Sequence, residues 1–248
     1  MVNIMGDTMS ITQNKADSVS QGGRKRAPIL PVAVMGLAGL ALLVFGIPQF
    51  VAGVLVAGDQ NTLWDLARQR PVAWNDLAAA VAAREDADRW MPTADREAER
   101  GLLLIRQAEA APEGSERDRL FAAAAEAIER SLSRGPVQPH GWAVLAVLRE
   151  RAGNRQGAAD ALRLSLLSGA FDPDLMIWRL RIGMRLLPVL SDETRALLTG
   201  QIRKVWVMSP DEIARLGGGE EGAALVQQAL AGLSASEITN YVRRIGVR

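Results

Sequence analysis

The sequence predicts an all-α protein in which one transmembrane helix near the N-terminus precedes a series of antiparallel helix pairs. Its composition favours helices over sheets, because aromatic residues make up only 4% of the 248 residues, and alanine, leucine and arginine dominate. Residues 28–58 carry no charged side chain. A pattern that begins at Ala124 returns at Ala158, an offset of 34 residues.

Charge and cysteine content exclude several classes of function. The formal net charge is +1, so no strong basic field indicates a nucleic-acid partner. The chain has no cysteine, which excludes disulfide frameworks, thiolate zinc sites and thiol nucleophiles. His140 is the only histidine, and its position at the start of a predicted helix favours a loop or capping role over catalysis.

Residues 28–58 form the predicted membrane anchor. The uncharged run is longer than the roughly 20 residues that a helix needs to cross the hydrocarbon core. Pro31 lies near the predicted start of the span, whereas Pro48 is expected to kink or end the helix, because proline removes a backbone donor. A cleaved signal peptide would have a shorter apolar segment, and an uncharged run of this length is rare in the core of a soluble domain.

The residues on either side of the anchor predict its orientation. Residues 1–27 are a polar tail, expected to be disordered, which ends in the basic cluster Arg24, Lys25 and Arg26. No comparable basic cluster follows the anchor at Asp59. The positive-inside rule therefore places the tail in the cytoplasm and residues 59–248 in the periplasm, across a bacterial inner membrane. The alternative is the inverted topology, with a cytoplasmic helical domain that acts in assembly.

After the anchor, amphipathic and alanine-rich segments separated by short breaks predict consecutive helices. Loops of only a few residues make such helices antiparallel neighbours. Start signals occur at Asp172-Pro173, at Ser209-Pro210, and at Ser115 with Asp118 three residues later. The expected helices span residues 74–90, 93–111, 115–134, 140–152, 155–168, 173 to about 188–191, 193–207, a short segment from 210 that glycines 217–219 end, 221–233 and 236–245.

One of these helix pairs carries a specific family pattern. A bulky residue, a leucine, a small residue, a turn glycine and a second-helix alanine follow in order as Trp142, Leu145, Ala146, Gly153 and Ala158. This order and the 34-residue period resemble the tetratricopeptide repeat. Ser165 stands where the family usually has an alanine, and Pro136 stands where a proline would end the preceding repeat. In that preceding unit, Ala124 and Ser131 occupy the positions that match Ala158 and Ser165.

The resemblance implies a tetratricopeptide-like superhelix of antiparallel helix pairs. Its best repeat covers about residues 139–172, and a partial repeat covers about 105–138. In such arrays, small residues let paired helices approach, and stacked pairs leave a surface for other proteins. The next unit departs from the pattern, because Met176 stands where Trp142 would repeat, and Leu187-Pro188 replaces the turn glycine.

Together, the resemblance and the anchor imply a scaffold or adaptor that binds membrane or envelope proteins through its helical-repeat groove. Surface polysaccharide biosynthesis or export is the favoured setting, with cytochrome c maturation and secretion as others. Three arginines on one predicted helix are candidates for a partner groove that accepts an acidic peptide or an anionic polymer: Arg179, Arg181 and Arg185. The alternative is a solvated polar helix face.

No motif predicts an enzyme. The chain lacks a G-x-S-x-G elbow, and the glycines near residue 217 are not followed by the G-K-[ST] of a phosphate-binding loop. Neighbouring carboxylates could form a glycosidase pair, but most such groups fall at predicted helix starts, where negative charge complements the helix dipole. We therefore expect no catalytic, metal-binding or cofactor-binding residue. The alternative is an envelope enzyme that cleaves glycans on an α-helical superhelix.

Overall fold

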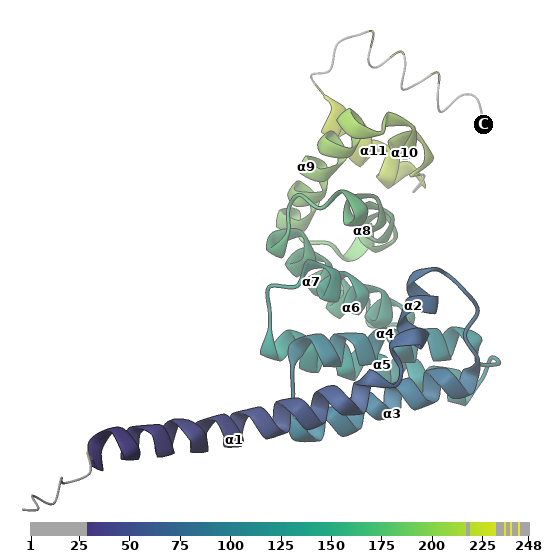
Figure 1. The fold of residues 1–248 in the computed structure, drawn as a ribbon. Helices are drawn as coiled ribbons and strands as arrows, with labels where there is room; N and C mark the ends of the chain where they lie inside the picture. Colours follow the sequence, from purple (N-terminus) through teal and green to yellow (C-terminus); the bar gives the residue numbers. More distant parts are fainter. Residues whose placement is uncertain (1–28, 217–218, 232–235, 237–238, 240–242, 244–248) are drawn as a thin grey trace, which may run out of the picture. The chain divides into compact units, whose positions relative to one another are not determined.

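The computed structural model describes residues 29–216, 219–231, 236, 239 and 243. These residues contain helices and no β-strand, which confirms the all-α prediction for them (Figure 1). The elements are α1 (Ile29–Ala57), α2 (Gln60–Ala67), α3 (Trp74–Trp90), α4 (Ala94–Ala110), α5 (Ser115–Arg134), α6 (Pro139–Arg151), α7 (Arg155–Ser168), α8 (Pro173–Leu186), a 3-10 helix η1 (Leu187–Val189), α9 (Asp192–Met208), α10 (Pro210–Arg215) and α11 (Gly219–Leu230).

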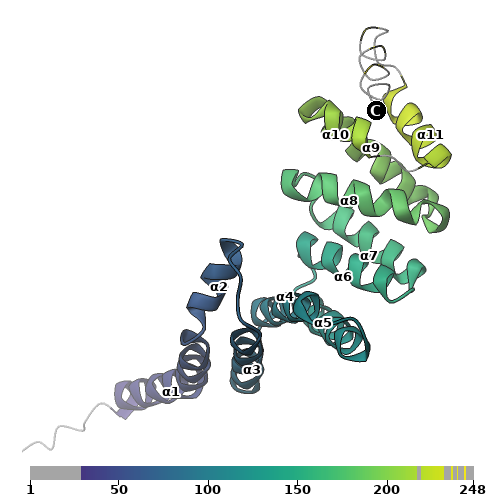
Figure 2. The same cartoon turned by 90° about the vertical axis from the view of Figure 1, so that its right-hand side faces the viewer.

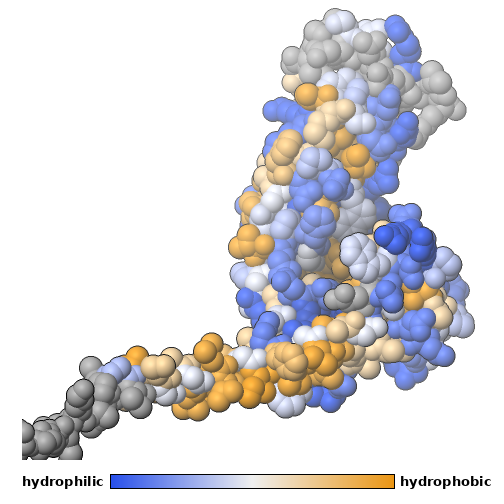
Figure 3. Space-filling view, in the orientation of Figure 1, coloured by the Kyte–Doolittle hydropathy of each residue, from blue (hydrophilic) through white to orange (hydrophobic). Residues whose placement is uncertain are grey.

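Helix α1 is long and apolar enough to cross a membrane. The stretch that meets both conditions is Ala33–Ala57, with 25 residues, and its surface is apolar along the face shown in Figure 3. Pro31 lies in the first turn, where backbone N–H groups have no helical partner and none is lost. Pro48 does not end the helix, which continues to Ala57. Because proline has no backbone N–H, its presence leaves one carbonyl oxygen in the preceding turn without its helical partner.

The described residues divide into two units between Val44 and Phe45. The predicted tail 1–27, with its basic cluster Arg24, Lys25 and Arg26, lies outside the described residues, as does most of the predicted last helix, 236–245. All contacts described below belong to the second unit.

Most helix starts follow their local signals. Helix α8 begins at Pro173 after the N-cap Asp172, whose carboxylate accepts a hydrogen bond from the backbone N–H of Leu175. At α5 the N-cap is Gly114 and not Ser115, so the expected side-chain cap does not form. Helix α2 is an element that the sequence patterns did not predict.

Helices α4 and α5 form one antiparallel hairpin, and α6 and α7 form another (Figure 2). An equivalent hydrogen bond closes each hairpin. Near the end of α5, the hydroxyl of Ser131 donates to the carbonyl oxygen of Ala94, the first residue of α4, at 2.7 Å. Likewise, the hydroxyl of Ser165 in α7 donates to the carbonyl oxygen of Pro139, the first residue of α6, at 2.6 Å. Both serines are buried. Each therefore ties the end of a second helix to the start of its first helix.

Small residues let the helices of each hairpin approach. Gly101 in α4 and Ala146 in α6 occupy the same position, counted from the first residue of each helix. In the second helices, Ala124 and Ala158 precede the closing serines by the same number of residues. Ala124, Ala146 and Ala158 are all fully buried. A Cβ atom on Gly101 would lie 2.6 Å from Cδ1 of Ile128, so only glycine fits there without rearrangement.

The first hairpin does not follow the 34-residue period throughout. The two helices α4 and α5 have 17 and 20 residues, whereas α6 and α7 have 13 and 14. The period therefore relates α5 to α7 but not α4 to α6. A repeat boundary at about residue 105 would cut α4 in the middle, and the hairpin instead covers residues 94–134.

The remaining residues of the repeat pattern lie at turns and in the core. Gly153, between α6 and α7, has a φ of +80°, a backbone conformation that glycine adopts without strain. Leu145 is buried in the main core. Trp142 packs partly against that core and donates from its indole N–H to the carbonyl oxygen of Pro136, at 2.8 Å. In the next hairpin, η1 takes the place of the turn glycine, and Met176 is fully buried.

Candidate partner-binding groove

An open groove of about 860 Å³ is lined by residues of α2, α4, α5, α6 and α8. Most of its lining is apolar, and Leu102 of α4 is 49% exposed there. Its volume falls within the range of roughly 300–1,000 Å³ that is typical of ligand pockets. The apolar side chains that line it include Leu102, Ile105, Phe121, Val144, Val147 and Trp178. We call this surface the apolar groove.

The charged side chains along the apolar groove are balanced in sign, with three arginines and three glutamates. Several are held by partners: Glu150 pairs with Arg185 at 2.7 Å, and Arg106 pairs with Glu109 at 2.9 Å. The guanidinium carbon of Arg151 lies 4.0 Å from the ring centroid of Phe121, a cation–π contact. The groove therefore favours an occupant that is apolar on one side and carries little net charge.

Helix α2 supplies one wall of the groove and continues from the end of α1. Its Leu63 and Leu66 line the groove and pack against a small core that includes Leu77 and Leu103. Apolar burial of this kind stabilises a short helix that would not form alone. The wall is therefore placed by packing, which no start signal in the sequence indicated.

A buried arginine links the residue that precedes α2 to the groove. Arg84 of α3 is 1% exposed and forms an ion pair with Asp59, the residue that precedes α2. Its Nε atom lies 2.9 Å from a carboxylate oxygen of Glu99, which lines the groove. One guanidinium group thus joins α2, α3 and α4. Sequence reasoning missed this cluster, because Asp59 and Glu99 lie far from Arg84 along the chain.

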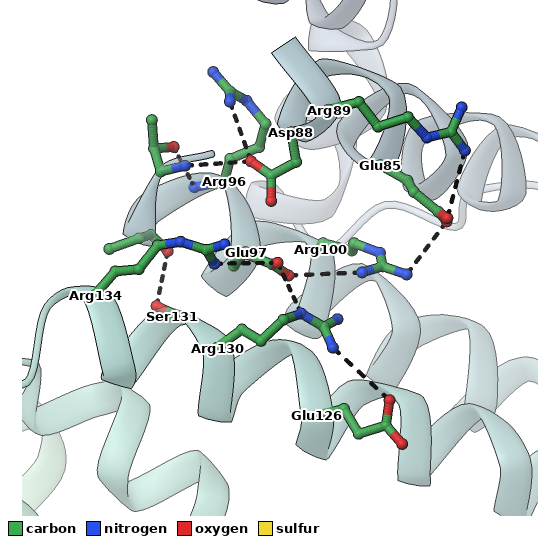
Figure 4. Close-up of polar contacts among 12 residues, drawn as sticks. Glu85, Asp88, Arg89, Arg96, Glu97, Arg100, Glu126, Arg130, Ser131 and Arg134 are labelled. Carbon is green, nitrogen blue, oxygen red and sulfur yellow. Dashed lines mark hydrogen bonds and ion pairs between the residues drawn. The ribbon is translucent and has the colours of Figure 1, made fainter. Parts of the chain in front are cut away.

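A second buried carboxylate holds α4 against α5 (Figure 4). Glu97 is 4% exposed, and its carboxylate accepts hydrogen bonds from Arg130 at 2.8 Å and from Arg134 at 3.3 Å. Arg100 lies 3.6 Å away. Burial raises the pKa of Glu97, but the hydrogen bond and the charge of Arg130, with further help from Arg100, outweigh it, so the pKa lies below its usual value.

The three predicted groove arginines do not form one surface. Arg179 is fully buried, so the expectation that it faces a partner is wrong: its Nε donates to the hydroxyl of Ser165 at 2.9 Å, and its Nη1 donates to the carbonyl oxygen of Gly169 at 2.7 Å. Burial lowers the pKa of Arg179, and the charge of Asp172 partly opposes this. Its positive charge complements the carbonyl end of α7.

Arg181 and Arg185 are exposed, but each pairs with a glutamate of another helix. Arg181 lies 2.9 Å from Glu212 of α10, and Arg185 forms two hydrogen bonds with Glu150 of α6, at 2.8 and 2.7 Å. The hydrogen bond with Glu150 raises the pKa of Arg185, against a smaller lowering by burial. These arginines therefore connect neighbouring hairpins. Only Glu150 among their partners lines the apolar groove.

His140 and the neighbouring carboxylates Glu85 and Asp86, which were considered for catalysis, lie at the surface and contact other residues. His140 is 65% exposed, with its Nδ1 atom 3.6 Å from a carboxylate oxygen of Asp172. Glu85 and Asp86 both pair with Arg89 on the surface of α3. In the part of the chain that the structure describes, no group of three or more histidine, cysteine, aspartate and glutamate side chains could hold a metal ion. Glycines 217–218 lie outside that part.

Comparison with protein-family models gives no match for this chain, and comparison with curated proteins gives none either. The case for a function therefore depends on the groove and on the helix that precedes it.

Proposed function

We propose that this protein is a membrane-anchored scaffold whose helical-repeat domain binds a segment of a partner protein in the apolar groove. The observation that carries the proposal is the open groove of about 860 Å³, mostly apolar and with its charges balanced in sign. Exposed apolar surface of this kind is typical of interaction sites.

The domain is proposed to be a tetratricopeptide-like superhelix. Support comes from the 34-residue relation between α5 and α7, the closing serines Ser131 and Ser165, and the turn glycine Gly153. Groove-forming helical arrays of this kind bind extended or helical segments of other proteins along a continuous surface. An amphipathic partner helix with a few apolar anchors matches the lining of the groove.

The proposed location is the inner membrane of a bacterial cell, with the N-terminus in the cytoplasm and the helical domain in the periplasm. Support comes from the apolar stretch Ala33–Ala57 and from the basic residues just before the anchor. Protease treatment of spheroplasts tests this orientation. Digestion of the domain from outside is expected, whereas protection of the domain in intact spheroplasts, with digestion after lysis, would establish the inverted topology.

Site-specific photo-crosslinking in intact cells tests the scaffold function. A photoreactive residue in place of Leu102, inside the groove, is expected to crosslink to one or a few envelope proteins. The matched control is the same residue in place of Ala122, which is exposed on α5 and does not line the groove. Partners of surface polysaccharide assembly are the favoured outcome. If both positions gave the same crosslinks, or neither gave any, the groove would not be a binding site.

A further inference from the structure

The charged side chains along the apolar groove are equal in number but unequal in how firmly they are paired. Each of the three glutamates that line the groove lies close to an arginine nitrogen. These pairs, at 2.7–2.9 Å, are Glu99 with Arg84, Glu109 with Arg106, and Glu150 with Arg185. Such distances are typical of charge-assisted hydrogen bonds. The carboxylates of the groove are therefore already compensated by positive charge.

Two of the lining arginines contact carboxylates at longer distances and in water. An Nη atom of Arg117 lies 3.5 Å from Glu113, whose side chain is 94% exposed. An Nη atom of Arg151 lies 3.9 Å from Asp118, whose side chain is 75% exposed. The side chains of Arg117 and Arg151 are 24% and 43% exposed, so a ligand can reach them. Because solvated pairs at such distances contribute little free energy, both arginines are available to the carboxylate of a ligand.

The two available arginines lie beside the same aromatic ring. The guanidinium group of Arg151 stacks over Phe121, 4.0 Å from the ring centroid. Arg117 precedes Phe121 by one helical turn of α5, so the two side chains are neighbours on the helix surface. A stacked guanidinium group keeps its N–H edge free and can hold a carboxylate through two parallel hydrogen bonds. Phe121 therefore marks a positively charged region of an otherwise apolar groove.

The rest of the lining restricts the kind of anion that fits. Apolar side chains from other helices, such as Leu102 of α4, Val147 of α6 and Trp178 of α8, make up most of it. A purely acidic ligand would leave these side chains in water. A purely apolar ligand would cover Arg117 and Arg151 without giving them a carboxylate, which is costly for a charged group. An amphipathic helix with an acidic residue next to its apolar face meets both demands.

We propose that the partner segment is an amphipathic helix with an aspartate or glutamate next to its apolar anchors, and that this carboxylate binds Arg117 and Arg151 beside Phe121. The inference rests on the proposed scaffold function and adds the chemistry by which the groove selects its segment. Apolar contacts supply most of the buried area, whereas the charge discriminates between segments, because a basic residue at the same place would be repelled.

Selection from a peptide library tests this preference. Full-length protein in lipid nanodiscs is screened with displayed amphipathic helices of about 18 residues, five turns, in which the positions beside the apolar face are random. Counter-selection on Leu102→Gln, a neutral change in the groove, removes peptides that bind elsewhere. The enriched peptides are expected to share an acidic residue at one position. By fluorescence anisotropy, glutamine at that position, or Arg117→Gln or Arg151→Gln in the protein, should each weaken binding by about tenfold.

A charge reversal separates recognition from damage to the fold. Arg151→Glu is expected to bind the peptide with lysine at the acidic position more tightly than the original peptide, which a misfolded variant would not do. The matched control is Arg119→Gln. Arg119 lies on the same helix as Arg117, is 74% exposed and does not line the groove, so this change is expected to leave binding unaltered.

The outcomes distinguish this inference from the scaffold proposal. If the groove-dependent peptides showed no preference for acidic residues, or if Arg151→Glu did not reverse it, the charge preference would be refuted and the scaffold proposal would stand. If no peptide survived the counter-selection, both would fail. If dodecanoate bound as tightly as the peptides, with the same loss in Arg151→Gln, the occupant would be an amphipathic lipid, and the peptide proposal would be overturned.

Discussion

The buried carboxylate of Glu97 allows the packing of α4 on α5 to be tested quantitatively. Replacement by glutamine keeps the shape of the side chain but removes its charge. A hydrogen bond to a charged group contributes about 1.5–3 kcal/mol, and Glu97 accepts from Arg130 and Arg134. These two arginines are 39% and 36% exposed, so water can take over part of their solvation. We therefore expect Glu97→Gln to lower the free energy of unfolding by about 1.5 kcal/mol, the low end of that range.

The loss should depend on pH. Because the pKa of Glu97 is lowered in the folded state, its charge contributes stability that is fully present above the unfolded pKa of about 4.3. That contribution is lost as the pH falls through the lower folded pKa. The difference between wild type and Glu97→Gln is therefore full at neutral pH and shrinks under acidic conditions.

Urea unfolding of the full chain in detergent micelles, followed by far-ultraviolet circular dichroism, measures both effects. The matched control is Glu116→Gln, which removes one carboxylate of a surface pair with Arg119, with the glutamate 56% exposed. Such pairs contribute about 0–1 kcal/mol. If Glu97→Gln cost no more than Glu116→Gln, or if its cost did not change with pH, the buried network would not stabilise the hairpin as argued.

Four further substitutions test other parts of the fold, three of them in the same unfolding assay and one by limited proteolysis. Gly101→Leu should lower the free energy of unfolding by about 1–3 kcal/mol, because the new side chain is overpacked against Ile128. Gly200→Ala should raise it by about 0.5–1 kcal/mol, because its site is open and alanine favours helix. Equal effects of the two substitutions would contradict the close approach of α4 to α5. Ser165→Ala should cost about 1–3 kcal/mol, since it removes the acceptor of buried Arg179, and no loss would show that this contact is absent in solution. Asp59→Ala leaves Arg84 with one carboxylate fewer and should speed limited proteolysis between α1 and α3, while unchanged cleavage would mean that the ion pair does not hold α2.

Local patterns in the sequence were sufficient for most of the helices, though not for α2, and for much of one hairpin. Helices α3, α5 and α7 have the expected bounds, because each combines amphipathic periodicity with a clear break at both ends. The small residues Ala146 and Ala158 are buried where two helices meet, as the repeat pattern implied. The scaffold function, the topology and the absence of enzymatic activity stay predictions.

The groove and the buried ion pairs could not be predicted, because they depend on which helices meet in space. Arg179 shows the difficulty: the sequence grouped it with Arg181 and Arg185 as a candidate for the partner groove. It lies in the core instead, because Ser165 of α7 and Gly169, the residue after α7, supply acceptors for its guanidinium group. The hairpin of α4 and α5 does not begin at about residue 105, where the partial repeat was expected, because the 34-residue period relates α5 to α7 but not α4 to α6; α4 itself lies within the expected range 93–111. The apolar groove draws its lining from five helices, and no single segment carries its signature.

The most direct test of the scaffold proposal uses the partner that crosslinking from Leu102 identifies. The measurement is the affinity of that partner for wild-type protein and for groove variants. Leu102→Arg puts a charge on a half-exposed groove position, where folding can tolerate it. Full-length protein in nanodiscs is titrated with the purified partner, and Ala122→Arg serves as the control. Binding to Leu102→Arg is expected to be at least about tenfold weaker than to wild type, because a buried unpaired charge is costly at an interface, and binding to the control is expected to be unchanged. Equal affinity for wild type and both variants would contradict the scaffold proposal.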